Sequence, residues 1–253
     1  MLNRITFGNG STRPPLLIVH GLFGSARNWG AIARRLAEDR RVVTVDQRNH
    51  GESFWAASHS YADMAGDLAE IISAEGGRMD VIGHSMGGKA TMLLALTRPA
   101  MVNRLVVADI APVAYGHSNL PLVEAMQALD LHGLTSRMEA DRRLRSAVPD
   151  GGTRAFLLQS LDLKADPPRW RLNLDVLAAE MEQVVGWPES EGRFDGPVLF
   201  LAGAQSNYLL REYREKIKKL FPQAVLAKIP GAGHWLHADK PQEFVAALRV
   251  FLK

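Results

Sequence analysis

The chain has 253 residues, of which 47% are hydrophobic and 23% are charged, a composition typical of a globular protein rather than of a disordered or membrane-embedded one. Its 30 basic and 27 acidic residues leave a formal net charge of +3, a surplus too small to predict a nucleic-acid partner. The chain contains no cysteine, which excludes disulfides, thiolate catalysis and cysteine-bound zinc.

The first third of the chain alternates short apolar runs with helical patterns. Buried strands are predicted at residues 15–20 and 41–46, and helices at residues 31–39 and 60–76. The second helix has Ser60 as its predicted N-cap. The first ten residues have neither an apolar core nor a small-residue cleavage site, and no apolar run is long enough to span a membrane. A cytoplasmic protein is therefore expected.

The same alternation returns in the rest of the chain. Further strands are predicted at 79–84, 104–110, 197–203 and 224–230. Helices are predicted at 86–97 and 241–252. Strands that are apolar along their whole length are typical of a parallel sheet covered on both faces. The predicted fold class is therefore α/β, with a doubly wound, mostly parallel sheet.

One region interrupts this alternation. Residues 112–195 contain several helical patterns and no convincing strand. Because the insertion leaves the sheet at the carboxyl ends of its strands, where open α/β sheets bind ligands, we expect a helical lid. The predicted organisation is a core of residues 1–111 and 196–253 with a lid of residues 112–195. A helical layer that only packs on the core is the alternative.

The sequence Gly-His-Ser-Met-Gly at residues 83–87 lies between a predicted strand and a predicted helix. It matches the G-x-S-x-G pattern, in which a serine stands on a sharp, strained turn and presents its hydroxyl at the strand end. Glycines two positions before and after the serine avoid Cβ clashes that would block the turn. Ser85 is therefore predicted to be a nucleophile, and the N–H of Met86 an oxyanion donor at a helix N-terminus. The alternative is a polar residue in an ordinary glycine-rich turn.

A second oxyanion donor is expected in the loop after the first predicted strand. This loop, residues 20–25, reads HGLFGS. The N–H of Leu22 is the predicted donor, and Phe23 is predicted to line the substrate site. His20 is interpreted as a structural residue that holds the loop. An ordinary strand-to-helix turn is the alternative.

Of the eight histidines, His234 is the predicted general base. It lies in the segment IPGAGHW, after the last predicted strand, and it follows Ser85 in the chain as this kind of site requires. The neighbouring Trp235 is predicted to contact the substrate, and His237 is the alternative base. The other histidines are interpreted as loop or structural residues, including His50 in the segment DQRNHGES.

The carboxylate that should accompany the histidine is missing from the position where serine-histidine sites commonly have it. The residues after the predicted strand at 197–203 read AQSNY and include no Asp or Glu. Asp109, at the carboxyl end of another predicted strand, can still reach the histidine and is the predicted acid. Capping of the lid hinge is the alternative role of Asp109. Asp195 and Glu212 are the nearest other carboxylates.

Five motifs together resemble the YbfF-type bacterial esterases of the α/β-hydrolase superfamily, namely HGLFGS, DQRNHGES, GHSMGGK, DIAP and PGAGHW. The resemblance extends from the first strands to the terminal helix and is weakest in the lid. It implies an α/β-hydrolase fold with an inserted helical lid, and a triad acid at the position of Asp109. It also implies hydrolysis of carboxylic esters and thioesters, including acyl-CoA.

These observations predict a serine hydrolase that uses no cofactor and no metal and acts on a small acyl ester or thioester. Hydrolysis of a carbon–carbon bond or a lactone by the same triad is one alternative. A small-molecule sensor that keeps the triad and signals through a partner protein is another, because one fold can host several functions. No oligomeric state is predicted.

Overall fold

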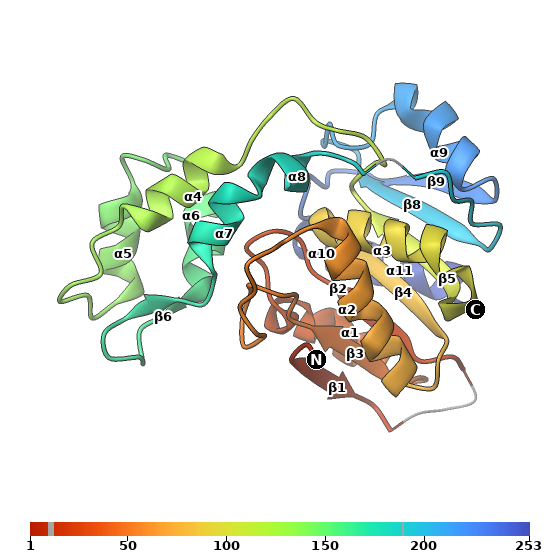
Figure 1. Ribbon diagram of the computed structural model, residues 1–253, viewed down its shortest axis with the longest axis horizontal. Coiled ribbons are helices and arrows are strands. Elements are labelled where there is room, and N and C mark those ends of the chain that lie inside the picture. Colours follow the sequence, from red (N-terminus) through yellow and green to blue (C-terminus); the bar gives the residue numbers. More distant parts are fainter. Residues whose placement is uncertain (10–12, 189) are drawn as a thin grey trace.

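The computed structural model describes residues 1–9, 13–188 and 190–253 (Figure 1). Within these ranges a seven-stranded sheet has the order β1-β3-β2-β4-β5-β8-β9. The strands are β1 (Arg4–Phe7), β2 (Leu16–Val19), β3 (Val42–Val45), β4 (Met79–His84), β5 (Val102–Ala108), β8 (Val198–Gly203) and β9 (Ala224–Ile229). β1 is antiparallel to β3, and the other neighbouring strands are parallel. The predicted doubly wound, mostly parallel sheet is therefore confirmed.

β1 is a strand that the sequence pattern missed. Its four residues alternate exposed and half-buried side chains at one edge of the sheet, where Arg4 is paired with Val45. Such a short segment has too few apolar positions to be distinguished from a loop by periodicity.

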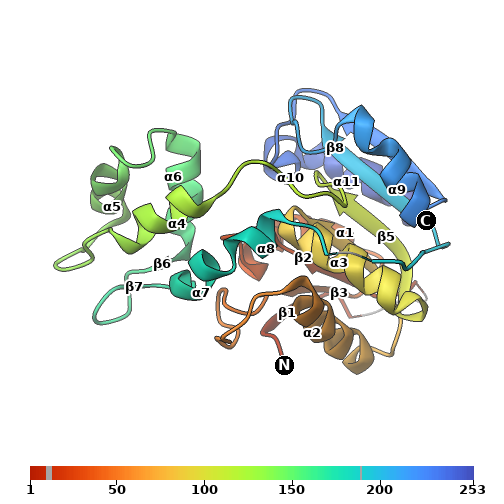
Figure 2. The same ribbon diagram turned by 45° about the horizontal axis from the view of Figure 1, so that its top comes forward.

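Helices cover both faces of the sheet (Figure 2). On one face lie α1 and α11, and on the other α2, α3 and α9, with bounds Gly30–Leu36, Pro241–Phe251, Tyr61–Ala74, Met86–Thr97 and Arg214–Leu220. In β2, Leu16 and Ile18 belong to the hydrophobic cluster on the side of α1 and α11. Leu17 and Val19 belong to the cluster on the side of α2, α3 and α9. Because successive side chains point to opposite faces, each central strand is buried along its whole length.

Short helical segments complete the core. They are η1 (Ala26–Trp29), η2 (Pro99–Met101), η4 (Arg211–Tyr213) and α10 (Leu236–Asp239). At the start of α2 the hydroxyl of Ser60 accepts a hydrogen bond from the N–H of Asp63 at 3.2 Å, which confirms the predicted N-cap. Across the part of the chain that the structure describes, no helix is long and apolar enough to cross a membrane.

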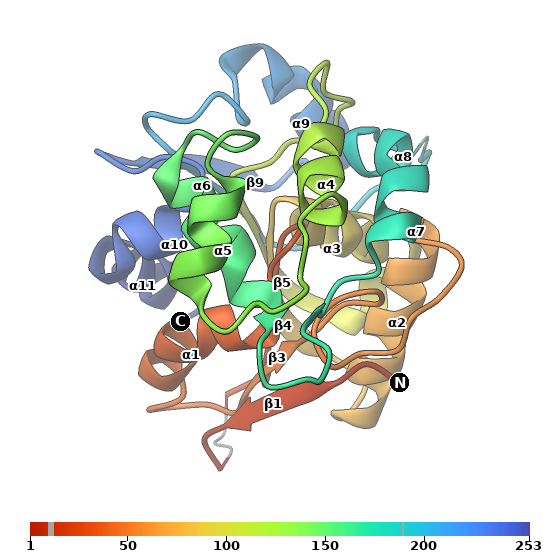
Figure 3. The ribbon, with the colours of Figure 1, turned by 90° about the vertical axis from the view of Figure 1, so that its left-hand side faces the viewer.

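Between β5 and β8 the chain forms a separate group of helices, called the insertion below. Its elements are α4 (Leu120–Gln127), α5 (Arg137–Leu144), α6 (Gly151–Leu157), η3 (Leu158–Ser160), β6 (Leu161–Asp162), β7 (Arg169–Trp170), α7 (Leu174–Ala179) and α8 (Met181–Val185). Figure 1 shows it beside the sheet rather than on either face, and Figure 3 looks onto it. The two-stranded sheet of β6 and β7 was not predicted, because two-residue strands carry no periodicity.

The carboxyl end of the insertion is bound to the core by hydrogen bonds to its backbone carbonyls. The hydroxyl of Tyr61 donates to the carbonyl of Val184 at 2.5 Å. The ammonium of Lys89 donates to the carbonyl of Val185 at 2.8 Å and also to that of Gly186. Lys89, in the first turns of α3, is buried at this junction. This burial lowers the pKa of its amine to about 7.

Candidate active site

Ser85 stands at the sharp turn from β4 to α3. Its backbone has φ 52° and ψ −123°, a conformation that non-glycine residues rarely adopt. A Cβ atom at Gly83 would overlap the side chain of Thr91, and one at Gly87 would overlap the carbonyl of His20. The two flanking glycines are therefore required by close packing around the turn.

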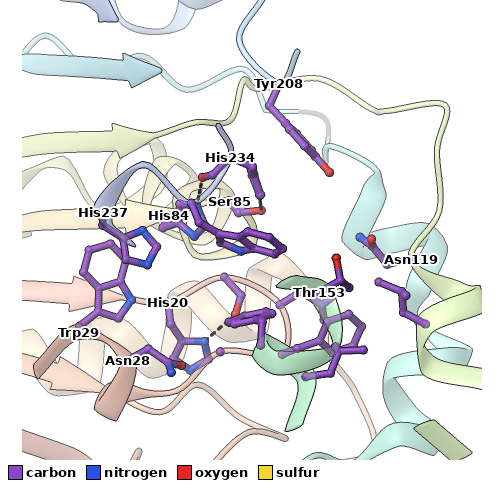
Figure 4. A pocket seen from close by; sticks show the side chains of 18 residues that line it. His20, Asn28, Trp29, His84, Ser85, Asn119, Thr153, Tyr208, His234 and His237 are labelled. Atoms are coloured by element: carbon purple, nitrogen blue, oxygen red, sulfur yellow. Dashed lines mark hydrogen bonds between the residues drawn. The ribbon is translucent and has the colours of Figure 1, made fainter. Parts of the chain in front are cut away.

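His234 and Asp109 lie next to Ser85 although all three come from distant segments. The Nε2 atom of His234, in the loop between β9 and α10, is 3.1 Å from the hydroxyl oxygen of Ser85. Its Nδ1 atom donates to Oδ2 of Asp109 at 2.7 Å. Figure 4 shows the imidazole of His234 beside Ser85. The structure therefore brings the predicted nucleophile, base and acid into one hydrogen-bonded chain.

Asp109 follows β5 and is completely buried, with φ 52°. Its carboxylate is compensated by several donors, since the N–H of Gly203 donates to Oδ1 at 3.0 Å and the hydroxyl of Ser206 donates to Oδ2 beside His234. A buried carboxylate needs such partners to offset its lost hydration. Ser206 was missed by sequence reasoning, although it lies in the very segment, AQSNY, where an acid was sought.

The two alternative acids lie elsewhere. Asp195 is 66% exposed and pairs with Arg193 at 2.6 Å. Glu212 is an exposed residue of η4. Neither contacts His234 among the hydrogen bonds of the described residues, so Asp109 is the carboxylate that the geometry favours.

The loop after β2 packs directly against Ser85. A Cβ atom at Gly21 would lie 3.0 Å from the Cβ of Ser85, which places the neighbouring N–H of Leu22 close to the serine. Met86 is the first residue of α3, so its N–H has no carbonyl one turn earlier within the helix. Both predicted oxyanion donors thus border Ser85, and the positive end of the α3 dipole reinforces the second.

Buried histidines hold this loop in place. His50 donates from Nδ1 to the carbonyl of Arg48 at 2.9 Å and accepts the N–H of Phe23 at Nε2 at 3.3 Å. Its neighbour His20 donates from Nδ1 to the carbonyl of Gly21 at 2.8 Å and accepts the N–H of Gln47 at 3.0 Å. Burial lowers the pKa of both rings, so they act as neutral hydrogen-bonding groups. These contacts agree with the structural role predicted for His20.

The other histidines near the site also support it without reaching Ser85. The Nε2 atom of His84 donates to the carbonyl of His234 at 2.9 Å and so fixes the loop that carries His234. His237, the alternative base, is stacked on Trp29 with ring centroids 4.1 Å apart. Burial lowers the pKa of His237 to about 3. Its position therefore favours a packing role.

A cavity of about 260 Å³, called the large cavity below, opens above Ser85 and lies between the core and the insertion. The predicted substrate contacts Phe23 and Trp235 both line it. The insertion contributes residues that sequence reasoning missed, namely Asn119, Leu122, Thr153, Phe156 and Leu157. Figure 4 shows Asn119 and Thr153 on the side away from Trp29.

Two aromatic contacts tie this cavity to the base. The ring of Tyr208 is stacked on His234, with centroids 4.1 Å apart and an interplanar angle of 24°. The ring of Phe156, from α6, lies 5.2 Å from that of Trp235. The first contact restrains the imidazole, and the second joins the insertion to the loop that carries it. Aromatic side chains have no spacing signature that would have identified this pairing from sequence.

Comparisons with known proteins agree with this geometry. A family model described as the alpha/beta hydrolase family matches residues 16–247. The chain is 41% identical over 252 residues to the sn-1-specific diacylglycerol lipase ABHD11 of Mus musculus, covering 96% of this chain and 82% of that protein. It is 37% identical over 249 residues to the esterase YbfF of Escherichia coli strain K12, covering 98% and 96%. A solved marine microorganism esterase matches with a TM-score of 0.94 at 36% identity, covering 99% and 98%.

Proposed function

This chain belongs to the alpha/beta hydrolase family, and we propose that it is a serine hydrolase that cleaves carboxylic esters or thioesters of small acyl substrates. The observation that carries the proposal is the hydrogen-bonded chain from Ser85 through His234 to Asp109, with separations of 3.1 and 2.7 Å. Relatives named esterase and lipase support an ester substrate. The choice between ester and thioester rests on the motif resemblance alone.

The first half of the reaction forms an acyl-enzyme. His234 accepts the Ser85 proton at Nε2 while the serine oxygen attacks the substrate carbonyl carbon. Asp109 accepts the Nδ1–H, so it holds the required tautomer and stabilises the imidazolium that forms. The N–H groups of Leu22 and Met86 donate to the negatively charged carbonyl oxygen.

The intermediate then collapses, and His234 donates its proton to the leaving alcohol or thiol. In the second half a water molecule loses a proton to His234 and adds to the acyl carbon. Collapse of this second intermediate returns the proton to Ser85 and releases the carboxylic acid. Every proton transfer uses one imidazole nitrogen, which is why the stacking of Tyr208 on that ring matters.

The insertion, residues 112–195, acts as the lid in this proposal. Its side chains close the large cavity over Ser85, with Phe156 meeting Trp235 across the opening. A covered site excludes water. Because water then no longer competes for the same hydrogen bonds, the bonds to the developing negative charge become stronger. Catalytic residues come from the core, residues 1–111 and 196–253. A cytoplasmic location stays a prediction from the sequence.

Covalent labelling with a fluorophosphonate tests the nucleophile. The reagent phosphonylates an activated serine, and peptide mass spectrometry should locate the adduct on Ser85. The Ser85→Ala variant should lose on the order of 10⁶-fold in kcat on p-nitrophenyl acetate, as expected when the nucleophile of such a triad is removed. Labelling of a different serine, or turnover by the variant near that of the parent, would disprove the proposal.

A further inference from the structure

Two cavities of very different size meet at Ser85. Besides the large cavity of about 260 Å³, a second one of about 30 Å³ also borders the serine and is called the small cavity below. Met86, Ile110 and Val184 are among the residues that line the small cavity alone. Leu22, Ser85, Asn119 and Tyr208 border both. A carbonyl carbon bound to Ser85 therefore has access to both spaces.

The position of the base distinguishes the two spaces. His234 lines the large cavity and is not part of the wall of the small one. The leaving oxygen or sulfur must receive its proton from Nε2 of His234, which is 3.1 Å from the Ser85 oxygen. The leaving group therefore departs on the side of the large cavity, and the acyl substituent points to the other side of the carbonyl carbon.

We propose that the small cavity holds the acyl group and the large cavity holds the alcohol, so that the preferred substrates are esters of short acids with larger apolar alcohols. This inference rests on the proposed function and specifies its substrate class. One water molecule needs about 10–15 Å³ of such space, so the small cavity has room for roughly two heavy atoms. The methyl of an acetyl group or the ethyl of a propionyl group, each of which extends beyond the carbonyl carbon, fits this space, whereas a longer alkyl chain does not.

The wall of the small cavity is held by the junction between insertion and core. Ile110 is 3% exposed and follows the acid Asp109 in the chain. Val184 is buried, and its carbonyl accepts the Tyr61 hydroxyl at 2.5 Å. Because Ile110 is buried and the backbone of Val184 is held by this hydrogen bond, the cavity has little freedom to expand around a longer acid.

The large cavity has room for the larger part of the substrate. Its insertion side carries Leu122, Phe156 and Leu157, and Trp235 faces them from the core. An apolar alcohol gains from contact with these side chains when it leaves water. The difference in volume between the two cavities therefore points to the same partition of the substrate.

A pair of isomeric esters tests this assignment in the unmodified protein. Hexyl acetate and ethyl hexanoate have the same atoms, but they place the six-carbon chain on opposite sides of the ester. We expect kcat/KM for hexyl acetate to exceed that for ethyl hexanoate by at least about tenfold, the lower end of what one misplaced methylene costs in an apolar pocket. Acid release measured by titration reports both rates.

The outcomes separate the inference from the proposed function. Faster hydrolysis of ethyl hexanoate, or equal rates, overturns the acyl assignment while leaving the serine hydrolase intact. Hydrolysis of neither ester, together with the absence of fluorophosphonate labelling at Ser85, contradicts the proposed function itself.

Matched variants locate the determinant. Val184→Ala enlarges the small cavity, so the rate ratio of ethyl butanoate to ethyl acetate should rise by about tenfold. Leu122→Ala enlarges the large cavity and should leave this acyl ratio unchanged. A rise in the acyl ratio with Leu122→Ala and none with Val184→Ala would assign the acyl group to the large cavity and refute the inference.

Discussion

The core and the insertion border the same cavity but hold their side chains in different ways. Ser85 and Asp109 lie directly after neighbouring parallel strands, and their N–H groups donate to the carbonyls of Ala108 and Leu201 at 3.0 and 2.9 Å. The sheet ladder thus continues into both proposed catalytic residues. By contrast, Phe156 of the insertion lies on the seven-residue helix α6 and meets the core through a ring contact with Trp235.

Under the proposed function, this difference assigns the catalytic residues to the core and part of the substrate selectivity to the insertion. A reacting group misplaced by a small distance loses much of its rate, so it benefits from a position defined by several backbone hydrogen bonds. A cavity wall must only exclude or accept bulk, and side-chain packing is sufficient for that. Substitutions in the core should therefore change turnover or stability, whereas substitutions in the insertion should change which substrates are accepted.

The largest effect in this comparison is expected at the acid. Asp109→Asn removes the charge that holds the His234 tautomer and should lower kcat on p-nitrophenyl acetate by about 10⁴-fold. Asp195→Asn is the matched control, because Asp195 is exposed and remote from the triad, and it should leave kcat unchanged. The opposite pattern in these two variants would transfer the acid role to Asp195.

A smaller loss is expected from the hydroxyl that supports the acid. Ser206→Ala removes one donor from Oδ2 of Asp109 and should lower kcat/KM by roughly ten- to a hundredfold, since a hydrogen bond to a charged group contributes about 1.5–3 kcal/mol. Ser206→Thr keeps the hydroxyl and should recover most of the activity. If Thr is as damaging as Ala, the residue acts through packing and not through its hydroxyl.

Substitutions in the core and in the insertion should also differ in their effect on the free energy of unfolding. Phe244 of α11 is completely buried, and Phe244→Ala should lower the free energy of unfolding by about 3–5 kcal/mol without changing kcat per folded molecule. Phe156→Ala, in the half-buried wall of the large cavity, should cost less stability and change KM instead. Urea unfolding and steady-state kinetics on the two variants check this division, which fails if both variants behave alike.

A further effect on stability, visible in its pH dependence, is expected at the junction of the two regions. Because burial lowers the pKa of Lys89 from 10.5 in the unfolded chain to about 7, the unfolded chain binds more protons between these values. Lys89 should therefore make the free energy of unfolding rise with pH from about 7 to about 10.5, and Lys89→Met should remove that part of the rise. A pH dependence identical in the parent and the variant would show that the amine is not desolvated in the folded state.

Local patterns in the sequence predicted most of the fold. Strand and helix periodicities identified the parallel core strands and four of the five helices that cover them, with α9 the exception, because the burial of a side chain repeats with the geometry of its element. The two glycines around Ser85 were informative for a similar reason, since only glycine avoids a Cβ clash at those positions. The edge strand β1 and the two-residue strands of the insertion were too short for such patterns.

For the candidate site, the sequence by itself named Ser85, Asp109 and His234 from their order and from the strand ends that they follow, and their roles stay a proposal. Only the tertiary structure showed that Ser206 donates to Asp109, that His84 donates to the carbonyl of His234 and that Phe156 lies against Trp235. A short motif reflects the local backbone geometry that its own residues need. Contacts between residues far apart in the chain depend on strand register and helix packing, which no short segment contains.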